Sequence, residues 1–246
     1  MYSFLTILKM DLKNLFRNPV LIGYNTIFIF LITLIMGFLT GGAYQSSKAS
    51  YQYYVITFII YSILNGAMTA SNCFMERDIR KPNLRIIYSP AGSFQVYFSK
   101  IAASFLFDTI LHFLFLAIFC SAFGLTLGNS PIYFLLLMIP VEFGAAALGI
   151  FFCCLLHTEE AASTLLSTFI SLLALLGGTF FSLDGLGSAM IILSRLSPVK
   201  WLNEAFFEIA IDNNLHLFGS VMFGSILVSA LLVLGCSLLF KTEDYL

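Results

Sequence analysis

Long apolar runs constrain this chain more than any other feature of its sequence. Of its 246 residues, 59% are hydrophobic and only 10% are charged. A soluble domain is nearer one quarter charged, so this chain has too few polar residues to cover a water-exposed surface. Lipid must therefore replace water around most of it. The sequence predicts an all-α, polytopic membrane protein that forms one domain over residues 1–246.

Six apolar segments have the length of a transmembrane helix, because about 20 residues at ~1.5 Å each match the hydrocarbon thickness of a bilayer. A very short loop joins the third and fourth, which predicts an antiparallel hairpin. Pro140 predicts a kink in the fourth. We expect the six spans at residues 20–40, 51–75, 98–124, 132–156, 161–182 and 216–240.

Residues 1–18 have the periodicity of an amphipathic helix. Its apolar face comprises Phe4, Leu5, Leu8, Leu12, Leu15 and Phe16, and beside it runs a basic row of Lys9, Lys13 and Arg17. This pattern favours a helix in the cytoplasmic interface that ends before Pro19, with the basic row toward anionic head groups. The alternative is that these residues are the first turns of a long first span.

The segment Glu76–Lys100 is the one long polar interruption between apolar runs. It carries five of the 12 Lys and Arg residues, namely Arg77, Arg80, Lys81, Arg85 and Lys100. Short cytoplasmic loops accumulate Lys and Arg, so we expect this segment on the cytoplasmic side. Its apolar middle predicts a short amphipathic helix within 79–90, between Pro82 and Pro90. Such a helix would be a docking surface for a soluble partner.

The distribution of charge predicts the orientation. With both termini inside, the cytoplasmic side holds Lys9, Lys13, Arg17, the five basic residues of the polar segment and Lys241, which makes nine, against Lys48, Arg195 and Lys200 outside. We therefore expect a multi-pass protein of the plasma membrane, in a bacterial cell, with both termini in the cytoplasm.

Residues 183–212 do not follow the pattern of a span. A turn at Asp184–Gly187 precedes a short apolar stretch, and Ser197 then opens an amphipathic helix. Two short helices here could dip into the outer leaflet without crossing it. The single tryptophan, Trp201, suits a membrane interface.

Four polar side chains lie inside the expected spans. Asn65 fits a helix–helix hydrogen bond or a cavity wall. Asp108 and His112 share a helix face, which fits a structural pair, a contact with a partner helix or a transport role. Glu142 needs a partner or water, and fits either packing against another polar group or gating. Asn65, Met68 and Glu142 are the candidates for a substrate pathway.

The sequence contains none of the common nucleotide-binding or catalytic motifs. There is no Gly-Lys pair, hence no P-loop, and no HExxH, GxSxG, GxGxxG or CxxC motif. The five cysteines lie in or beside apolar runs without metal-ligand spacing. We expect no catalytic residue, no metal and no cofactor bound by this chain, and no nucleic-acid partner because its basic residues are few.

The order of these segments resembles the membrane subunit of an ABC-2-type transporter. The resemblance rests on the N-terminal helix before six spans, on Glu76-Arg77 and Leu84–Pro90 with Lys100, and on the stretch Leu196–Trp201 between spans five and six. One departure is that Arg80-Lys81-Pro82-Asn83 stands where the family often has Gly-Thr.

The resemblance implies a machine of several subunits. Two such permeases, identical or homologous, would form the pathway in the lipid, and two cytosolic ABC ATPase subunits would supply ATP and magnesium. Residues 1–18 would be the connecting helix and 79–90 the coupling helix. Residues 183–212 would be extracellular re-entrant helices with gate candidates Pro198, Trp201 and Glu204. The ATPase contacts would come from Glu76, Arg77, Arg80, Lys81, Leu84, Arg85, Ile86, Ile87, Tyr88 and Pro90.

The resemblance favours ATP-driven export. The 27 Phe and 8 Met residues suit a hydrophobic or amphipathic substrate, such as a drug in multidrug resistance or an antimicrobial peptide. Other members of the family suggest a lipid-linked glycan or sodium instead. Two alternatives come from other classes of protein: a secondary transporter driven by ions through Asp108 and Glu142, and a non-transporting immunity protein that sequesters a ligand.

Overall fold

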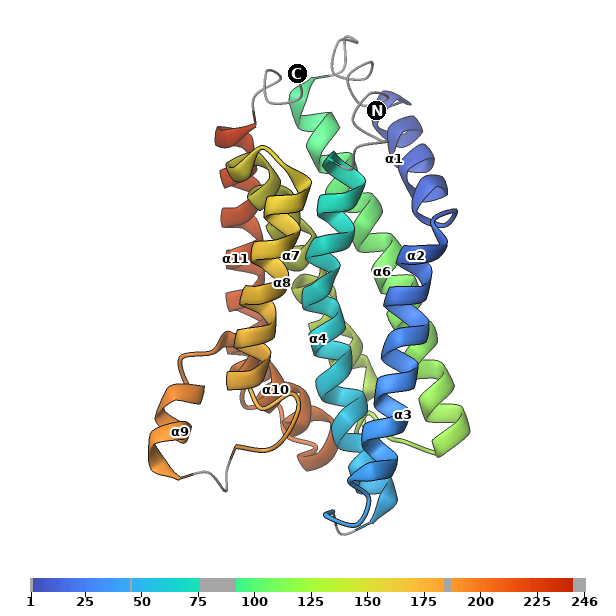
Figure 1. Ribbon diagram of the computed structural model, residues 1–246, viewed down its shortest axis with the longest axis vertical. Helices are drawn as coiled ribbons and strands as arrows, with labels where there is room; N and C mark the ends of the chain where they lie inside the picture. The colour runs from blue at the N-terminus through green and yellow to red at the C-terminus, as the bar shows by residue number, and fades with distance from the viewer. Residues whose placement is uncertain (1, 45, 76–91, 184–186, 241–246) are drawn as a thin grey trace.

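The computed structural model describes residues 2–44, 46–75, 92–183 and 187–240. Over these ranges the chain is helical and contains no strand. Six of the described helical segments are long and apolar enough to cross a membrane, and they run side by side (Figure 1). The prediction of an all-helical protein with six spans is confirmed.

The spans are assembled from the following elements. A separate helix, α1 (Tyr2–Leu15), precedes a first span made of α2 (Pro19–Ile22), the π-helix η1 (Gly23–Phe28) and α3 (Ile29–Leu39). The remaining spans are α4 (Ser47–Met75), α6 (Ser93–Phe123), α7 (Pro131–Leu156), α8 (Glu159–Leu176) and α11 (Phe218–Leu239). Between α8 and α11 lie α9 (Ser188–Ser194), α10 (Pro198–Phe207) and the π-helix η2 (Glu208–Asp212).

A break separates α1 from the first span. The side chain of Asn18 accepts hydrogen bonds from the backbone N–H groups of Val20 and Leu21, at 3.1 and 3.3 Å. Pro19 follows as the first helical residue, where its missing N–H costs nothing. This cap starts a new helix, so residues 1–18 are not the first turns of a longer span.

The fifth span is shorter than the sequence suggests. It ends at Leu176 instead of residue 182 because two glycines follow it. The N–H of Gly177 donates to the carbonyl of Leu173 at 2.7 Å, and Gly178 adopts φ +78°, a conformation that favours glycine. The chain therefore leaves the helix here, and α10 packs against this end.

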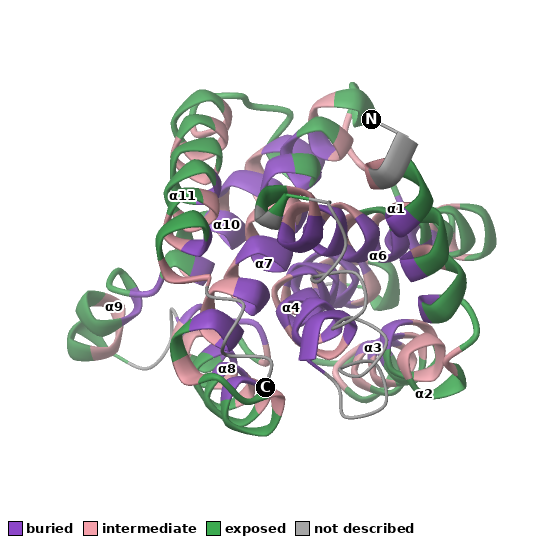
Figure 2. Ribbon diagram, turned by 90° about the horizontal axis from the view of Figure 1, so that it is seen from above, coloured by how far each residue is buried: buried purple, intermediate pink, exposed green. Residues whose placement is uncertain are grey.

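The core lies along α4 and α7. Within its most apolar stretch α4 is 83% buried, whereas the corresponding share of α11 is 11%. Figure 2 shows buried residues concentrated on α4 and α7, with exposed faces on the surrounding helices. At the closest approach Ser71 on α4 donates to the carbonyl of Gly149 on α7 at 3.1 Å. A side chain at Gly149 would meet the carbonyl oxygen of Ala67, so glycine permits this contact.

The two ends of the bundle differ. The end of α4 at Met75, the start of α6 and the end of α11 lie at the same end as α1, while α9 and α10 lie at the opposite end (Figure 1). The predicted coupling helix, with Glu76 through Pro90, falls outside the described residues. The helix ends that flank it are thus on the side of α1.

Replacing Gly149 by alanine should loosen the packing of α4 on α7. The added Cβ would lie 2.0 Å from the carbonyl oxygen of Ala67, so one helix must shift. We expect the free energy of unfolding to fall by about 1–3 kcal/mol. Thermal unfolding in detergent measures this, and Gly224→Ala, which has open space around it, is the control. Equal losses in both variants would contradict the packing described here.

Candidate functional site

The spans enclose a network of polar side chains around His112 of α6. The Nδ1 atom of His112 lies 2.9 Å from Oε1 of Glu142 on α7, and its Nε2 atom lies 2.7 Å from the hydroxyl of Ser62 on α4. The Thr109 hydroxyl donates to the other oxygen of Glu142. Because His112 and Glu142 are at most 3% exposed, these bonds replace those that water would otherwise provide. The network therefore links α4, α6 and α7.

A second set of contacts extends the network to the first span. Asn25 of η1 donates from Nδ2 to the Thr69 hydroxyl at 3.1 Å, and the Asp108 carboxyl lies beside the same stretch of α4. Gly66 makes room for that carboxyl, since an added Cβ would lie 2.7 Å from its Oδ2 atom. Asp108 therefore faces α4, and α4 is in turn bonded to the first span through Thr69.

The geometry excludes one of the alternatives for Asp108, His112 and Glu142. The two residues of α6 do not pair with each other; His112 pairs with Glu142, and Asp108 contacts α4. Both are partner-helix contacts, which is the arrangement expected of ionisable groups at membrane depth. Among the described residues no cluster of three or more His, Cys, Asp or Glu could hold a metal ion.

The pathway candidates Asn65 and Met68 lie on a stripe of α4 with Tyr61 and Asn72. These residues recur at helical spacing, and α4 lies between α8 and the first span on one side of the bundle (Figures 1 and 2). Met68 is half-buried, whereas Asn65 is buried and donates to the carbonyl of Tyr61 at 2.7 Å. The amide oxygens of Asn65 and Asn72 accept no hydrogen bond within the described ranges. Glu142, the third candidate, lies away from this stripe in the network.

Hydroxyl side chains on α8 continue the polar stripe. Ser171 approaches the hydroxyl of Tyr61 at 3.4 Å. Thr164 and Thr168 lie on the same face of α8, and both are exposed. We call the residues Tyr61, Asn65, Met68, Asn72, Thr164, Thr168 and Ser171 the polar stripe. Of these residues Thr164 and Thr168 are exposed, Asn65 is buried, and the other four are half-buried.

The gate candidates lie on α10 at the opposite end from α1. Ser197 caps this helix and donates from its hydroxyl to the Leu173 carbonyl at 2.7 Å, and Asn203 donates to the Gly177 carbonyl at 2.9 Å. Pro198 and Trp201 are exposed. The indole of Trp201 donates to the Arg195 carbonyl at 3.0 Å, and Glu204 pairs with Lys200 at 3.4 Å. The cap therefore fixes α10 against the end of α8.

An ion pair between α1 and α6 was not expected from the sequence. Lys100, grouped above with the charges of the polar segment, lies within α6 and is fully buried. Its ammonium lies 2.5 Å from Oδ1 of Asp11 on α1. The buried face of α1 consists of Ile7, Asp11 and Leu15, while Leu5 and Phe16 of the expected apolar face are exposed. The sequence did contain a signal for this pair, because Asp11 lies four residues after Ile7 and four before Leu15, on the same face of the helix.

Burial makes the charge on Asp11 costly. Desolvation raises the pKa of Asp11 above its ordinary value of 3.8, and the Lys100 ammonium offsets this only in part. An acid whose pKa is raised by folding binds its proton more tightly in the native state. The free energy of unfolding contributed by Asp11 therefore increases as the pH falls through its raised pKa. It decreases again as the pH rises and the buried carboxyl loses its proton.

Six spans with partnered ionisable groups between them define a polytopic helical membrane protein. A family model described as "ABC-2 type transporter" matches residues 2–211, which is most of the chain. The chain belongs to this family, and it is a transmembrane permease of that type. A comparison with curated proteins gives no match.

Removing Glu142 should destabilise the bundle. In Glu142→Ala, His112 and Thr109 lose their shared acceptor, and an unpaired buried polar group costs about 1–3 kcal/mol. We expect Glu142→Gln, which still accepts hydrogen bonds, to lose less. Thermal unfolding in detergent measures both variants.

The double variant Glu142→Ala with His112→Ala provides the control. Because both partners of one bond are removed, its loss should be smaller than the sum of the two single losses. Additive losses would show that the two side chains are not energetically coupled.

Proposed function

We propose that this permease works as the membrane subunit of an ATP-driven exporter. Membership of the ABC-2 family carries the proposal, because transport in such systems combines a permease with ATPase subunits. The sequence itself has no P-loop, so ATP and magnesium would bind to a separate cytosolic ABC ATPase, present in two copies. The chain would have no catalytic residue of its own.

The ATPase would dock on the end of the bundle that carries α1. Support comes from the helix ends that flank residues 76–91 and from the basic residues of that segment, which favour the cytoplasmic side. On this assignment α1 is the connecting helix and residues 79–90 the coupling helix. Both termini then lie in the cytoplasm, and the chain belongs to the plasma membrane of a bacterial cell.

The pathway would form between two permease subunits, identical or homologous, at the polar stripe. Polar side chains at membrane depth face protein or water more often than lipid. The exposed hydroxyl residues Thr164 and Thr168 support a partner surface or a water-filled passage here. At the far end, α9 and α10 would be the re-entrant helices, with Pro198, Trp201 and Glu204 near the exit.

The chemistry of the polar stripe favours an amphipathic substrate. Aromatic, thioether, amide and hydroxyl groups alternate along it, and the stripe as defined contains no charged residue. A hydrophobic or amphipathic drug, or an antimicrobial peptide, can satisfy such a wall with apolar contacts and a few hydrogen bonds. A glycan or sodium would need more polar or charged groups.

An ion-driven secondary transporter would use Asp108 and Glu142 as coupling groups. The contacts of Glu142 support a structural role instead, because His112 and Thr109 both bond its carboxylate. Gradient-driven transport without any ATPase, lost in Glu142→Gln, would favour the secondary transporter over the exporter. Tight ligand binding without turnover would favour an immunity protein.

Placing an acidic residue in the predicted coupling helix should weaken binding of the ATPase. In Arg85→Glu or Ile86→Asp we expect the dissociation constant to rise by about tenfold or more, since a buried interface contact contributes 1.4 kcal/mol or more. Binding of the purified ATPase to permease in nanodiscs measures this. Lys48→Glu, before the second span, is the control. Unchanged binding in both coupling-helix variants would refute the docking assignment.

Photocrosslinking tests the pathway between two permeases. A photoreactive amino acid at Met68 or Thr168 should join two permease chains, because both side chains belong to the polar stripe. The same probe at Leu234, exposed on α11, should react with lipid instead. Gel electrophoresis of the irradiated membrane reads the result. If only the probe at Leu234 crosslinked two permease chains, the interface would lie at α11 and not at the polar stripe.

A further inference from the structure

The buried face of α1 contains an acid where packing alone would use an apolar residue. Ile7, Asp11 and Leu15 are spaced four residues apart and are all less than 9% exposed. The flanking positions are apolar and Leu15 packs in a cluster with Ala103 and Phe107 of α6. Asp11 is instead ion-paired to Lys100, which is 0% exposed. The contact between α1 and α6 therefore combines apolar packing with one buried charge pair.

A buried charge pair is weak evidence of added stability, and its best-attested use is to specify how two helices pack. Taking two charges out of water costs several kcal/mol, and well-packed apolar residues of similar size are often as stable or more stable. Apolar packing tolerates sliding and rotation between helices, whereas a buried ion pair has one acceptable register. The pair thus distinguishes one placement of α1 on α6 from its neighbours.

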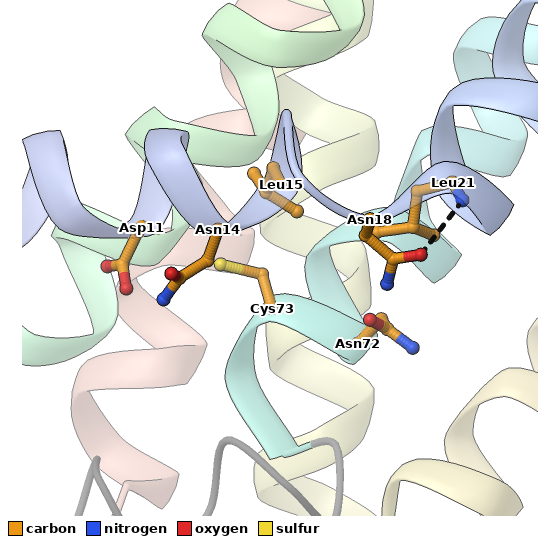
Figure 3. Close-up of a pocket in the computed structure, with 7 residues that line it drawn as sticks. All are labelled: Asp11, Asn14, Leu15, Asn18, Leu21, Asn72 and Cys73. Atoms are coloured by element: carbon orange, nitrogen blue, oxygen red, sulfur yellow. Dashed lines mark hydrogen bonds between the residues drawn. The ribbon is translucent and has the colours of Figure 1, made fainter.

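Contacts on the other side of Asp11 are weaker. Its Oδ2 atom has no hydrogen-bond partner among the described residues. A small pocket of about 10 Å³, roughly the volume that one water requires, lies beside it and is lined by α1, the first span and α4. Figure 3 shows Asp11, Asn14, Leu15, Asn18, Leu21, Asn72 and Cys73 around it. The polar tie of Asp11 is therefore to α6 and not to α4.

The position of Lys100 along α6 links the ion pair to the centre of the bundle. Lys100 lies about two turns after Ser93, where α6 begins at the end that also holds α1. Further along the same helix, Thr109 and His112 hold the network to α4 and α7. One continuous helix therefore connects the proposed ATPase side, α1 and the centre of the bundle.

We propose that the Asp11–Lys100 ion pair is a register pin that makes α1 move with α6 as one body during transport. The proposal rests on the proposed function, in which a motor acts on the end of the bundle that carries α1. Asp11 and Lys100 are positioning residues, since neither contacts substrate or nucleotide. Without the pin, α1 would remain packed on α6 but could slide, and movement at this end would reach the pathway less completely.

An apolar pair separates this role from simple packing. The double variant Asp11→Leu with Lys100→Met keeps volume and burial but removes the charges. We expect it to fold with an unfolding temperature equal to or above that of the wild type. In proteoliposomes with the ATPase, ATP hydrolysis should continue while transport per ATP falls by about fivefold or more. Lys13→Met, on the exposed face of α1, is the control and should transport normally.

A distance measurement in the isolated permease tests the pin without any ATPase. Spin labels attached to unnatural amino acids at Lys13 and Ile110, both exposed, report the placement of α1 on α6. The wild type should give one narrow distance distribution, and the apolar double variant a broad or shifted one. Native cysteines stay in place because the labels do not react with them.

The following results would contradict the register pin or the proposed function. A narrow, unchanged distribution or normal transport in the apolar double variant would overturn the pin. A double variant that fails to fold would overturn it too, because the pair would then be needed for the fold itself. If the wild type shows no ATP-dependent transport, the proposed function fails, while the distance measurement still decides whether the pin exists.

Discussion

An ionisable side chain within the lipid-embedded part of a protein needs a polar partner or water, because the hydrocarbon interior of a bilayer offers no hydrogen bonds. In this permease the constraint is met chiefly at His112, which holds Glu142 on one side and Ser62 on the other. These bonds fix the relative placement of α4, α6 and α7. Two further polar regions lie on helices that belong to or contact this centre. They are the pair Asp11–Lys100, between α1 and α6, and the polar stripe on α4 and α8.

Each of the three polar regions contains a buried side-chain oxygen that has no hydrogen-bond partner among the described residues. In the central network both nitrogens of His112 and both oxygens of Glu142 have partners. In the pair between α1 and α6 one oxygen of Asp11 is left over, and on the polar stripe Asn65 and Asn72 each retain an orphaned oxygen. The extension of the network to the first span is incomplete as well, because Oδ1 of Asp108 and Oδ1 of Asn25 have no hydrogen-bond partner among the described residues. An unpaired buried polar group is costly in a low-dielectric interior, so water or a partner at any of these atoms would stabilise the structure.

The number of spans and their approximate positions could be predicted because span length follows from bilayer thickness alone. The break before Pro19 was visible as well, since an Asn-Pro pair favours the start of a helix. The partners of the polar side chains could not be predicted. Lys100 looked like a loop charge because Asp11 lies 89 residues away, and Glu142 was recognised as costly without any sign that His112 would face it. Periodicity describes one helix at a time, whereas pairing depends on how helices pack.

The central claim is that this permease transports only when a separate ATPase drives it. The most direct test reconstitutes the purified chain in liposomes, with and without the ATPase, and follows a fluorescent amphipathic probe. The account predicts probe movement only when permease, ATPase, ATP and magnesium are all present. Equal movement by the permease alone, driven by an ion gradient, would contradict it.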